Sequence, residues 1–484
     1  MSADVVSLAA AWVRHWTDRP NDPVLVDDQG RTLVGRQVNE MTAQRASDLA
    51  ASGIARGSRV LLSCAPSIDL ALTYIALMRL GITVLPANTG YTERELEHLV
   101  TDARPVAAIV DDPRRLHGFD RWGVDVVVSA EVPLPHAPIR HELLDQADAD
   151  DSAFIAYTSG TTGAPKGAVL TQANLLAGAK AVVQAWEWQA ADRLVMALPL
   201  FHMHGLGVGL NGSLLAGSSV VVVPRFSVDA VLDAIARHAG TMFFGVPTMY
   251  ARLAASDRVS ELSALRLAVS GSAPLPVSVW HRLAKRSGVQ VLERYGMTET
   301  VMLTSNPLHG ERRCGTVGVP LPNVDVRLGE GGAVQVRGPN VFTHYLNRDR
   351  ESQEAFTDDG WFITGDIGQW DDANYLQLVG RASELIITGG FNVYPPELED
   401  VLREHPLVID IAVVGTPDEE WGEVVTAYVV LDDSASAYSS WRDTLAAHAG
   451  ERLAPYKVPR VWHRVGELPR NAMGKVVRSE LTPP

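Results

Sequence analysis

The sequence has little cysteine, little excess positive charge and no long apolar run. Its only two cysteines, Cys64 and Cys314, exclude a disulfide framework and a zinc site of four thiolates. The net charge of −15 disfavours nucleic acid and anionic membranes as general partners. The most apolar stretch, residues 70–86, is interrupted by Arg79 and is too short to span a bilayer. Because the N-terminus also lacks a signal pattern, we expect a cytoplasmic monomer or homodimer without stable membrane insertion.

The chain does contain enough apolar material for a large core. Its 484 residues are 46% hydrophobic and 20% charged, which suggests roughly two to four domains. Short apolar runs alternate with helical segments such as residues 38–52 and 68–80. This alternation predicts an α/β fold with parallel sheets flanked by helices. The expected strands are at residues 57–63, 82–86, 106–110, 194–198, 219–223, 240–244 and 265–270.

The pattern changes toward the C-terminus. Residues 317–336 contain short strands with glycine and proline turns, which predicts a small β subdomain. A boundary is expected at residues 380–384. Beyond it, residues 396–402 are typical of a helix start, and residues 408–414 and 423–431 of strands. We therefore expect a large N-terminal domain (residues 1–380) and a small α+β C-terminal domain (residues 381–484).

A strand at residues 154–159 leads into the loop YTSGTTGAPKG, residues 157–167. Glycines allow the backbone to approach an anion, while hydroxyls and a lysine contact phosphate oxygens. The loop is not a Walker A motif, because Pro165 stands where that motif has glycine before the lysine. The alternative is a flexible surface turn. The expected phosphate contacts in the loop are Ser159, Gly160, Thr161, Thr162, Gly163 and Lys166.

The segment GVGLNG, residues 207–212, matches the dinucleotide pattern G-x-G-x-x-G. It does not follow a clear strand, which that fingerprint requires. We interpret its glycines as contacts for helix packing.

Several further motifs accompany the phosphate loop in a fixed order. They are YGMTET (295–300), GWFITGD (360–366), GRASE (380–384) and PRNAMGK (469–475). Together with the loop they resemble the adenylate-forming superfamily, which includes acyl-CoA synthetases, amino-acid-activating adenylation domains and firefly luciferase. The resemblance covers residues 157–475. It implies an enzyme that activates a carboxylic acid with ATP as an acyl-adenylate. It also implies that residues 1–380 form the ATP- and acyl-binding domain and that residues 381–484 form a mobile lid domain that carries the catalytic lysine.

The resemblance implies a catalytic role for three residues of these motifs. Lys475 is expected to reach both the substrate carboxylate and the α-phosphate. Thr298 is expected on phosphate oxygens. Glu299 is expected to bind Mg²⁺ beside the triphosphate, with Thr158 as the second residue at the metal.

Other motif residues are expected to hold the nucleoside. Asp366 and Arg381 would bind the ribose hydroxyls, and Tyr295 would lie against the adenine. The segment GSAP, residues 271–274, resembles the part that lines the other adenine face. The further expected nucleotide contacts are Gly271, Ser272, Ala273, Glu293, Arg294, Gly296 and Met297.

The expected acceptor of the acyl group is CoA. The segment TGGFNVYP, residues 388–395, resembles the part of CoA synthetases that presents two glycines to the pantetheine arm. Ser383, Thr388, Gly389 and Gly390 are the expected CoA contacts. Ser383 departs from the family, which has Lys or Asp at this hinge position. Because no carrier domain follows residue 484, loading of a carrier in cis is not expected, but a free-standing enzyme that loads a separate carrier protein stays open.

The acid is expected to be a small dicarboxylate. The segments around Arg252 and Arg294 are similar to those of malonyl-CoA and methylmalonyl-CoA synthetases, in which arginines at these two positions bind the distal carboxylate. Arginine can satisfy a buried carboxylate with paired bonds. His202 and Ser270 are the further expected substrate contacts. The alternative for the two arginines is that Arg252 lies on the solvent side of a helix and Arg294 in a surface salt bridge. The alternatives for the function are a medium- or long-chain fatty acid, a metal at the His202 and His204 pair, or a silent relative that only binds nucleotides.

Overall fold

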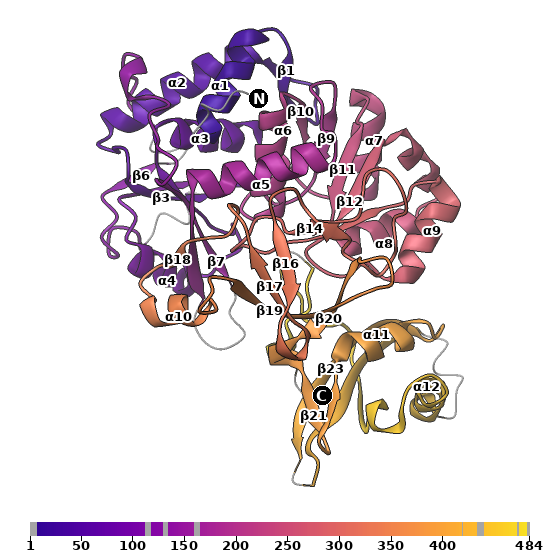
Figure 1. Ribbon diagram of the computed structural model, residues 1–484. Helices are drawn as coiled ribbons and strands as arrows, with labels where there is room; N and C mark the ends of the chain where they lie inside the picture. Colours follow the sequence, from indigo (N-terminus) through magenta and orange to yellow (C-terminus); the bar gives the residue numbers. More distant parts are fainter. Residues whose placement is uncertain are drawn as a thin grey trace.

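The computed structural model describes residues 7–111, 118–128, 134–158, 165–418, 420–432, 440–471 and 474–481. Two large sheets with helices form most of the molecule, and a small C-terminal unit lies against one end (Figure 1). The predicted fold class is therefore confirmed: parallel sheets flanked by helices, a small β subdomain and an α+β C-terminal unit.

Each large sheet has a parallel centre. The first runs β15 (Val319–Pro320), β14 (Thr304–Ser305), β13 (Leu292–Tyr295), β12 (Leu267–Ser270), β11 (Met242–Gly245), β9 (Arg193–Met196), β10 (Ser219–Val222), β1 (Pro23–Asp27), β2 (Thr32–Val34). The second runs β18 (His344–Tyr345), β8 (Lys166–Thr171), β7 (Ser152–Thr158), β4 (Thr83–Pro86), β3 (Arg59–Ser63), β5 (Ala107–Val110), β6 (Val126–Val128). Antiparallel pairing is confined to the edge strands β2, β14, β15, β8 and β18.

Both faces of these sheets are buried, which explains why the strands read as continuous apolar runs. In β10, Val220 packs into the central core and Val221 into the core on the opposite face. In β11, Phe244 packs into the central core and Phe243 into the core on the opposite face. Side chains alternate between faces along a strand, so both faces need apolar residues.

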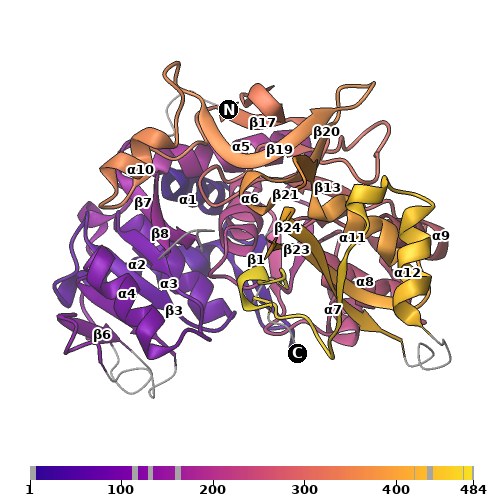
Figure 2. The same ribbon diagram turned by 90° about the horizontal axis from the view of Figure 1, so that it is seen from below.

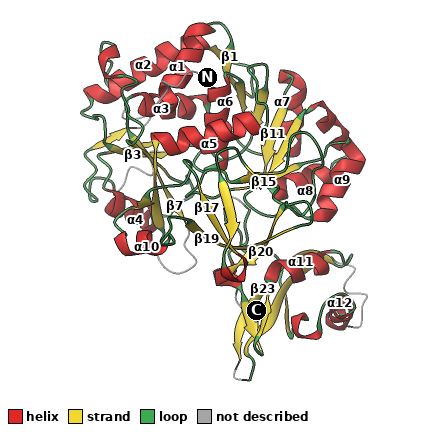
Figure 3. Cartoon of the chain, viewed as in Figure 1, coloured by secondary structure: helices red, strands yellow, loops and turns green. Residues whose placement is uncertain are grey.

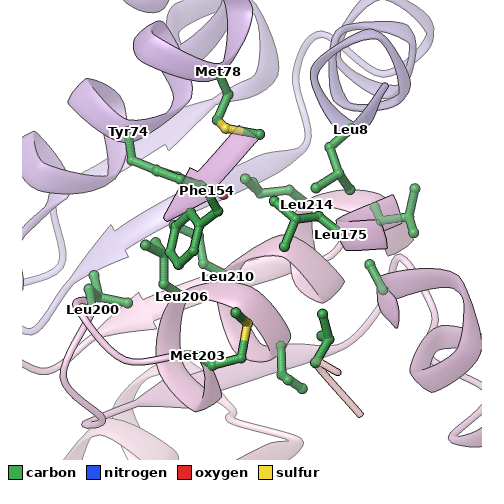
Figure 4. Packing of buried hydrophobic residues seen from close by; sticks show 14 of the residues in the cluster. Leu8, Tyr74, Met78, Phe154, Leu175, Leu200, Met203, Leu206, Leu210 and Leu214 are labelled. Atoms are coloured by element: carbon green, nitrogen blue, oxygen red, sulfur yellow. The ribbon is translucent and has the colours of Figure 1, made fainter. Parts of the chain in front are cut away.

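Helices form the layers between and outside the sheets (Figure 3). The central core, which includes residues of both sheets, contains α1 (Leu8–Asp18), α2 (Gly35–Ala51), α3 (Ile68–Arg79), α5 (Gln172–Ala185) and α6 (Asn211–Ala216). Figure 4 shows Leu8, Tyr74, Phe154 and Leu214 meeting there. On the outer faces lie α4 (Glu93–Ala103) and, on the opposite side in Figure 2, α7 (Val228–His238), α8 (Pro247–Ala255) and α9 (Val277–Ser287).

The helix α3 is buried around almost its whole circumference, so its apolar sequence serves the core. Its single arginine, Arg79, is 3% exposed and forms an ion pair of 2.9 Å with Asp145. None of the helices that the structure describes has both the length and the hydropathy to cross a membrane.

Two smaller sheets complete the molecule. The β subdomain consists of β16 (Asp325–Leu328), β17 (Ala333–Arg337), β19 (Phe362–Trp370) and β20 (Leu376–Arg381), and α10 (Asp349–Glu354) precedes β19. The C-terminal unit has its own core, which starts at Ile386. Its elements are β21 (Ile386–Thr388), β22 (Phe391–Val393), α11 (Pro395–Arg403), β23 (Val408–Asp418), β24 (Gly422–Leu431), α12 (Trp441–Gly450) and β25 (Val461–Arg464).

The glycine-rich segment GVGLNG belongs to a π-helix, His204–Leu210, that continues into α6. A Cβ on Gly207 would lie 2.0 Å from the Met203 sulfur, and one on Gly212 would lie 2.6 Å from the Trp188 ring. The glycines therefore allow close side-chain packing, which confirms that interpretation over the dinucleotide motif.

Candidate active site

A cavity of about 1040 Å³ opens between the carboxyl ends of the central strands, the β subdomain and the C-terminal unit. Twelve of the predicted site residues line it, although they come from distant parts of the chain. They are Thr158, Lys166, His202, Ser272, Arg294, Gly296, Met297, Thr298, Glu299, Arg381, Ser383 and Lys475. Parallel strands that end at one edge, together with a loop from the C-terminal unit, make this convergence possible.

One corner of the cavity is built on the Asp366 carboxylate. β19 and β20 pair so that Asp366 stands opposite Arg381. The Arg381 Nε donates to one Asp366 oxygen at 2.8 Å, and the Tyr295 hydroxyl donates to the other at 2.5 Å. Asp366 and Tyr295 are buried directly behind the lining residues. Burial opposes the charge of Arg381, but the negative charge of Asp366 outweighs it and raises the pKa of Arg381.

Glu299 presents a buried carboxylate to the cavity. The Tyr345 hydroxyl donates to it at 3.0 Å, and the Phe342 N–H donates to its backbone carbonyl at 2.7 Å. Burial raises the pKa of this carboxyl group, so a cation beside it would be stabilising. Lys166 points over the Tyr345 ring, with its Nζ 5.2 Å from the ring centre.

Backbone strain marks the segment that carries Glu299. Val301 has φ +56°, which is rare for a β-branched residue, and Ser272 on the facing loop has φ +72°. Gly178 of α5 makes room for Val301, since a Cβ there would lie 2.7 Å from its side chain. Such conformations persist only where the surroundings fix them, and they cluster at functional sites.

The far end of the cavity holds an unpaired guanidinium. Arg294 of β13 is 6% exposed, and its Nε and Nη2 have no hydrogen-bond partner among the described residues. Burial lowers its pKa to about 9. The group lies flat on Gly271, where a Cβ would come within 2.4 Å of its Cζ. This is a desolvated positive charge that lacks a counter-ion among the residues that the structure describes.

Neutral polar groups surround this guanidinium. Burial and the charge of Arg294 lower the pKa of His202 to about 4 and that of His204 well below its ordinary value. The His204 Nε2 and the Ser270 hydroxyl are buried without partners in the described part of the chain. The His204 ring stacks on Phe244 at 6.2 Å. The end of the cavity is therefore polar, with one net positive charge.

The C-terminal unit contributes Lys475 to the lining of the cavity. Its side chain is exposed to the open cavity, yet the surrounding protein atoms and the nearby charge of Arg381 lower its pKa. Gly474 packs on Thr248 at the start of α8, since a Cβ there would lie 2.9 Å from the threonine oxygen. The loop that carries the lysine is thus docked on the N-terminal part.

Other predicted residues lie away from the lining. Arg252 is exposed and is not brought to the cavity, because α8 turns Tyr250, Leu253 and Ala254 toward the core and leaves position 252 on the outside. Thr388, Gly389 and Gly390 also lie outside the lining, at the turn between β21 and β22. Ser270, Gly271 and Ala273 are not lining residues either. Ser159, Gly160, Thr161, Thr162 and Gly163 lie outside the described residues.

Glu293 does not line the cavity but holds loops of the fold together. Its buried carboxylate accepts the N–H groups of Leu275 at 3.1 Å and Gly315 at 3.2 Å, so it ties two loops to β13. Burial raises its pKa to about 7.

Glu293 should therefore make stability depend on pH. Its pKa rises from 4.5 to about 7 on folding, so the folded state loses stability as pH rises through this interval. Relative to Glu293→Gln, the parent should lose about 2 kcal/mol of unfolding free energy between about pH 5.5 and about pH 8.5. Urea unfolding of both proteins across this range measures the difference. A constant offset between them would contradict the assignment.

The sequence motifs missed Tyr345 and the α4 side of the cavity, which Tyr91, Arg94 and His98 line. Tyr345 reaches the site because β18 pairs with β8, placing it opposite Ala168. No periodicity signals such a contact between distant short strands. Among the described residues, no cluster of three or more His, Cys, Asp or Glu side chains could hold a metal, so the His202 and His204 pair lacks further ligands.

Comparison with known proteins places this site in a family. A family model described as AMP-binding enzyme matches residues 12–346, and its C-terminal domain matches residues 397–475. The chain is 34% identical to malonate–CoA ligase of Arabidopsis thaliana, over 89% of this chain and 78% of that protein. It is 31% identical to long-chain-fatty-acid–CoA ligase of Bacillus subtilis, over 95% and 91%. The crystal structure of ATP-bound MatB from Rhodopseudomonas palustris matches with a TM-score of 0.90 at 36% identity, covering 97% of each chain.

Proposed function

Because this chain belongs to the AMP-binding enzyme family and is an AMP-forming acid–thiol ligase, we propose that its acid is a small dicarboxylate such as malonate or methylmalonate. ATP would activate one carboxylate as the acyl-adenylate, and CoA would then displace AMP. The observation that carries the proposal is the buried Arg294 guanidinium, whose Nε and Nη2 have no partner in the described ranges of the chain.

A second carboxylate on the substrate would supply a counter-ion for Arg294. A bidentate arginine–carboxylate pair is worth more in a desolvated site than in water. A fatty acyl chain at the same place would leave the guanidinium buried and unpaired, which is costly. The Arabidopsis relative is named for malonate, whereas the Bacillus relative is named for long-chain fatty acids, so overall similarity alone does not select the acid.

The first half-reaction joins two anions, the carboxylate and the α-phosphate of ATP. Lys475 lines the cavity and would neutralise both. Thr158, Lys166 and Thr298 line the same cavity and would donate to phosphate oxygens. Asp366, already oriented by Tyr295 and Arg381, would accept the ribose hydroxyls.

The residues present fit a magnesium ion. Glu299 is a buried carboxylate with a raised pKa that faces the cavity, and Thr158 lines the same space. Mg²⁺ is commonly held by one or two carboxylates together with substrate phosphates and water, so a larger protein cluster is not needed. When bound, the ion would neutralise the phosphate charge. Glu299 would hold it, and Tyr345 would keep the carboxylate turned toward the cavity.

The second half-reaction requires a different pose of the C-terminal unit. Lys475 lines the cavity here, while Gly389 and Gly390 lie at a turn outside it. We place the division at residues 380 and 381, so that residues 381–484 rotate as a lid and bring the glycine turn to the pantetheine arm. Ser383 lines the cavity at this division. Loading of a separate carrier protein in place of CoA is the second candidate.

A panel of acids tests the proposal with the parent enzyme. Pyrophosphate release is measured with malonate, methylmalonate and octanoate, with and without CoA, and thioesters are identified by mass spectrometry. We expect kcat/KM for malonate to exceed that for octanoate by at least about 10²-fold. A preference for octanoate would overturn the dicarboxylate proposal. Pyrophosphate release without a CoA thioester, followed by acylation of an added carrier protein, would favour the second candidate.

A further inference from the structure

Tyr345 contacts two groups of the proposed phosphate site at once. Its hydroxyl donates to Glu299 Oε1 at 3.0 Å, and its ring lies under the Lys166 ammonium at 5.2 Å. In the described part of the chain, Lys166 has no ion-pair partner, so the ring is the group that faces its charge. Tyr345 is 8% exposed and lines the cavity.

The backbone around Tyr345 holds it firmly in this position. Tyr345 of β18 stands opposite Ala168 of β8, and Ala168 follows Lys166 by two residues on that strand. Its N–H donates to the Ser352 hydroxyl at 2.9 Å. The Phe342 ring packs on it edge-on at 4.7 Å, and the Phe342 N–H donates to the Glu299 carbonyl. One short segment thus fixes both the backbone and the side chain of Glu299.

We propose that Tyr345 is a positioning residue that sets the Glu299 carboxylate for Mg²⁺ and the Lys166 ammonium for the phosphates of ATP. The two tasks use different parts of the side chain. The hydroxyl stops the buried carboxylate from turning out of the cavity, and the ring holds the lysine beside it through its negative face. The inference rests on the proposed roles of Glu299 and Lys166 and does not depend on which acid is the substrate.

Two substitutions separate the tasks. Tyr345→Phe removes the hydroxyl and keeps the ring, while Tyr345→Leu removes both. Tyr375→Phe is the matched control, because the Tyr375 hydroxyl donates at 2.9 Å to the Glu311 carbonyl, and neither residue lines the cavity. Glu299→Gln gives the value expected when the carboxylate is lost. Thermal unfolding of each variant verifies that it is folded.

The measurement is the affinity for α,β-methylene-ATP, which cannot form an adenylate, by calorimetry in excess Mg²⁺ and in EDTA. The ratio of the two Kd values reports the coupling between metal and nucleotide. For Tyr345→Phe we expect this ratio to fall about 5- to 20-fold, with the Kd in EDTA unchanged. For Tyr345→Leu we expect the same fall and, in addition, a Kd in EDTA about 3- to 10-fold weaker. Tyr375→Phe should match the parent in both.

Three results would overturn parts of the scheme in distinguishable ways. A parental ratio in Tyr345→Phe would refute the task assigned to the hydroxyl. Equal Kd values in EDTA for the Leu and Phe variants would refute the task assigned to the ring. If the parent and Glu299→Gln gave the same ratio, the proposed metal role of Glu299 would itself be wrong.

Discussion

Replacing Lys475 with alanine is expected to slow formation of the acyl-adenylate about 10²- to 10³-fold. The lysine lines the cavity from the C-terminal unit, where burial by surrounding protein atoms and the charge of Arg381 lower its pKa. Without its positive charge, the substrate carboxylate and the α-phosphate, which are both anions, repel each other more strongly as they approach. Pyrophosphate release in a single turnover with malonate and ATP measures the step.

Lys457→Ala is the control for Lys475→Ala. Lys457 is also in the C-terminal unit, but its Nζ is paired with Glu397 at 2.5 Å, and it is not a lining residue. The Lys457→Ala variant should release pyrophosphate at nearly the parent rate. A second readout starts from preformed acyl-adenylate and CoA: thioester formation should survive in Lys475→Ala, because the proposed pose for that step withdraws the lysine. A near-parental rate of adenylation would show that Lys475 has another task.

The second large effect is expected at Arg294. In Arg294→Ala, kcat/KM for malonate should fall about 10²- to 10³-fold, because the distal carboxylate would be buried without its partner. The kcat/KM for octanoate should be unchanged or higher, because the substitution removes a buried charge and leaves space in its place. The two acids are compared at the same enzyme concentration by pyrophosphate release.

Arg252→Ala is the matched arginine control. Since Arg252 is exposed and outside the lining, both acids should be used within about twofold of the parent. Malonate turnover that survives in Arg294→Ala, or that is lost in Arg252→Ala, would refute the assignment of the distal anion site to Arg294.

Much of the fold could be predicted because the central strands are buried on both faces. The run at residues 219–223 became β10 (Ser219–Val222), and the run at 408–414 became the start of β23 (Val408–Asp418). The N-terminal proline and acidic first turn at residues 396–402 likewise mark α11 (Pro395–Arg403). These features are local, so a single sequence carries them.

The site was predictable only where motif residues lie at strand ends or in loops. The structure brings Arg381, Glu299 and Lys475 to one cavity, as the motifs suggested. Arg252 was expected at the substrate but does not line the cavity. A helix buries only one of its sides, and the spacing of residues does not reveal which side packs. Tyr345 was missed because its contacts depend on pairing between strands about 175 residues apart, which no local pattern encodes.

The π-helix His204–Leu210 has a consequence for how the acid pocket can change. Its wider turn includes the bond from the Val208 N–H to the Met203 carbonyl, five residues back, whereas an α-helix bonds four residues back. Removing one residue from such a turn restores α-helical spacing and rotates the preceding segment by about 100°. The direction in which His204 points therefore depends on chain length here as well as on residue identity. Insertions and deletions, which percentage identity does not count, are thus a route by which related pockets diverge.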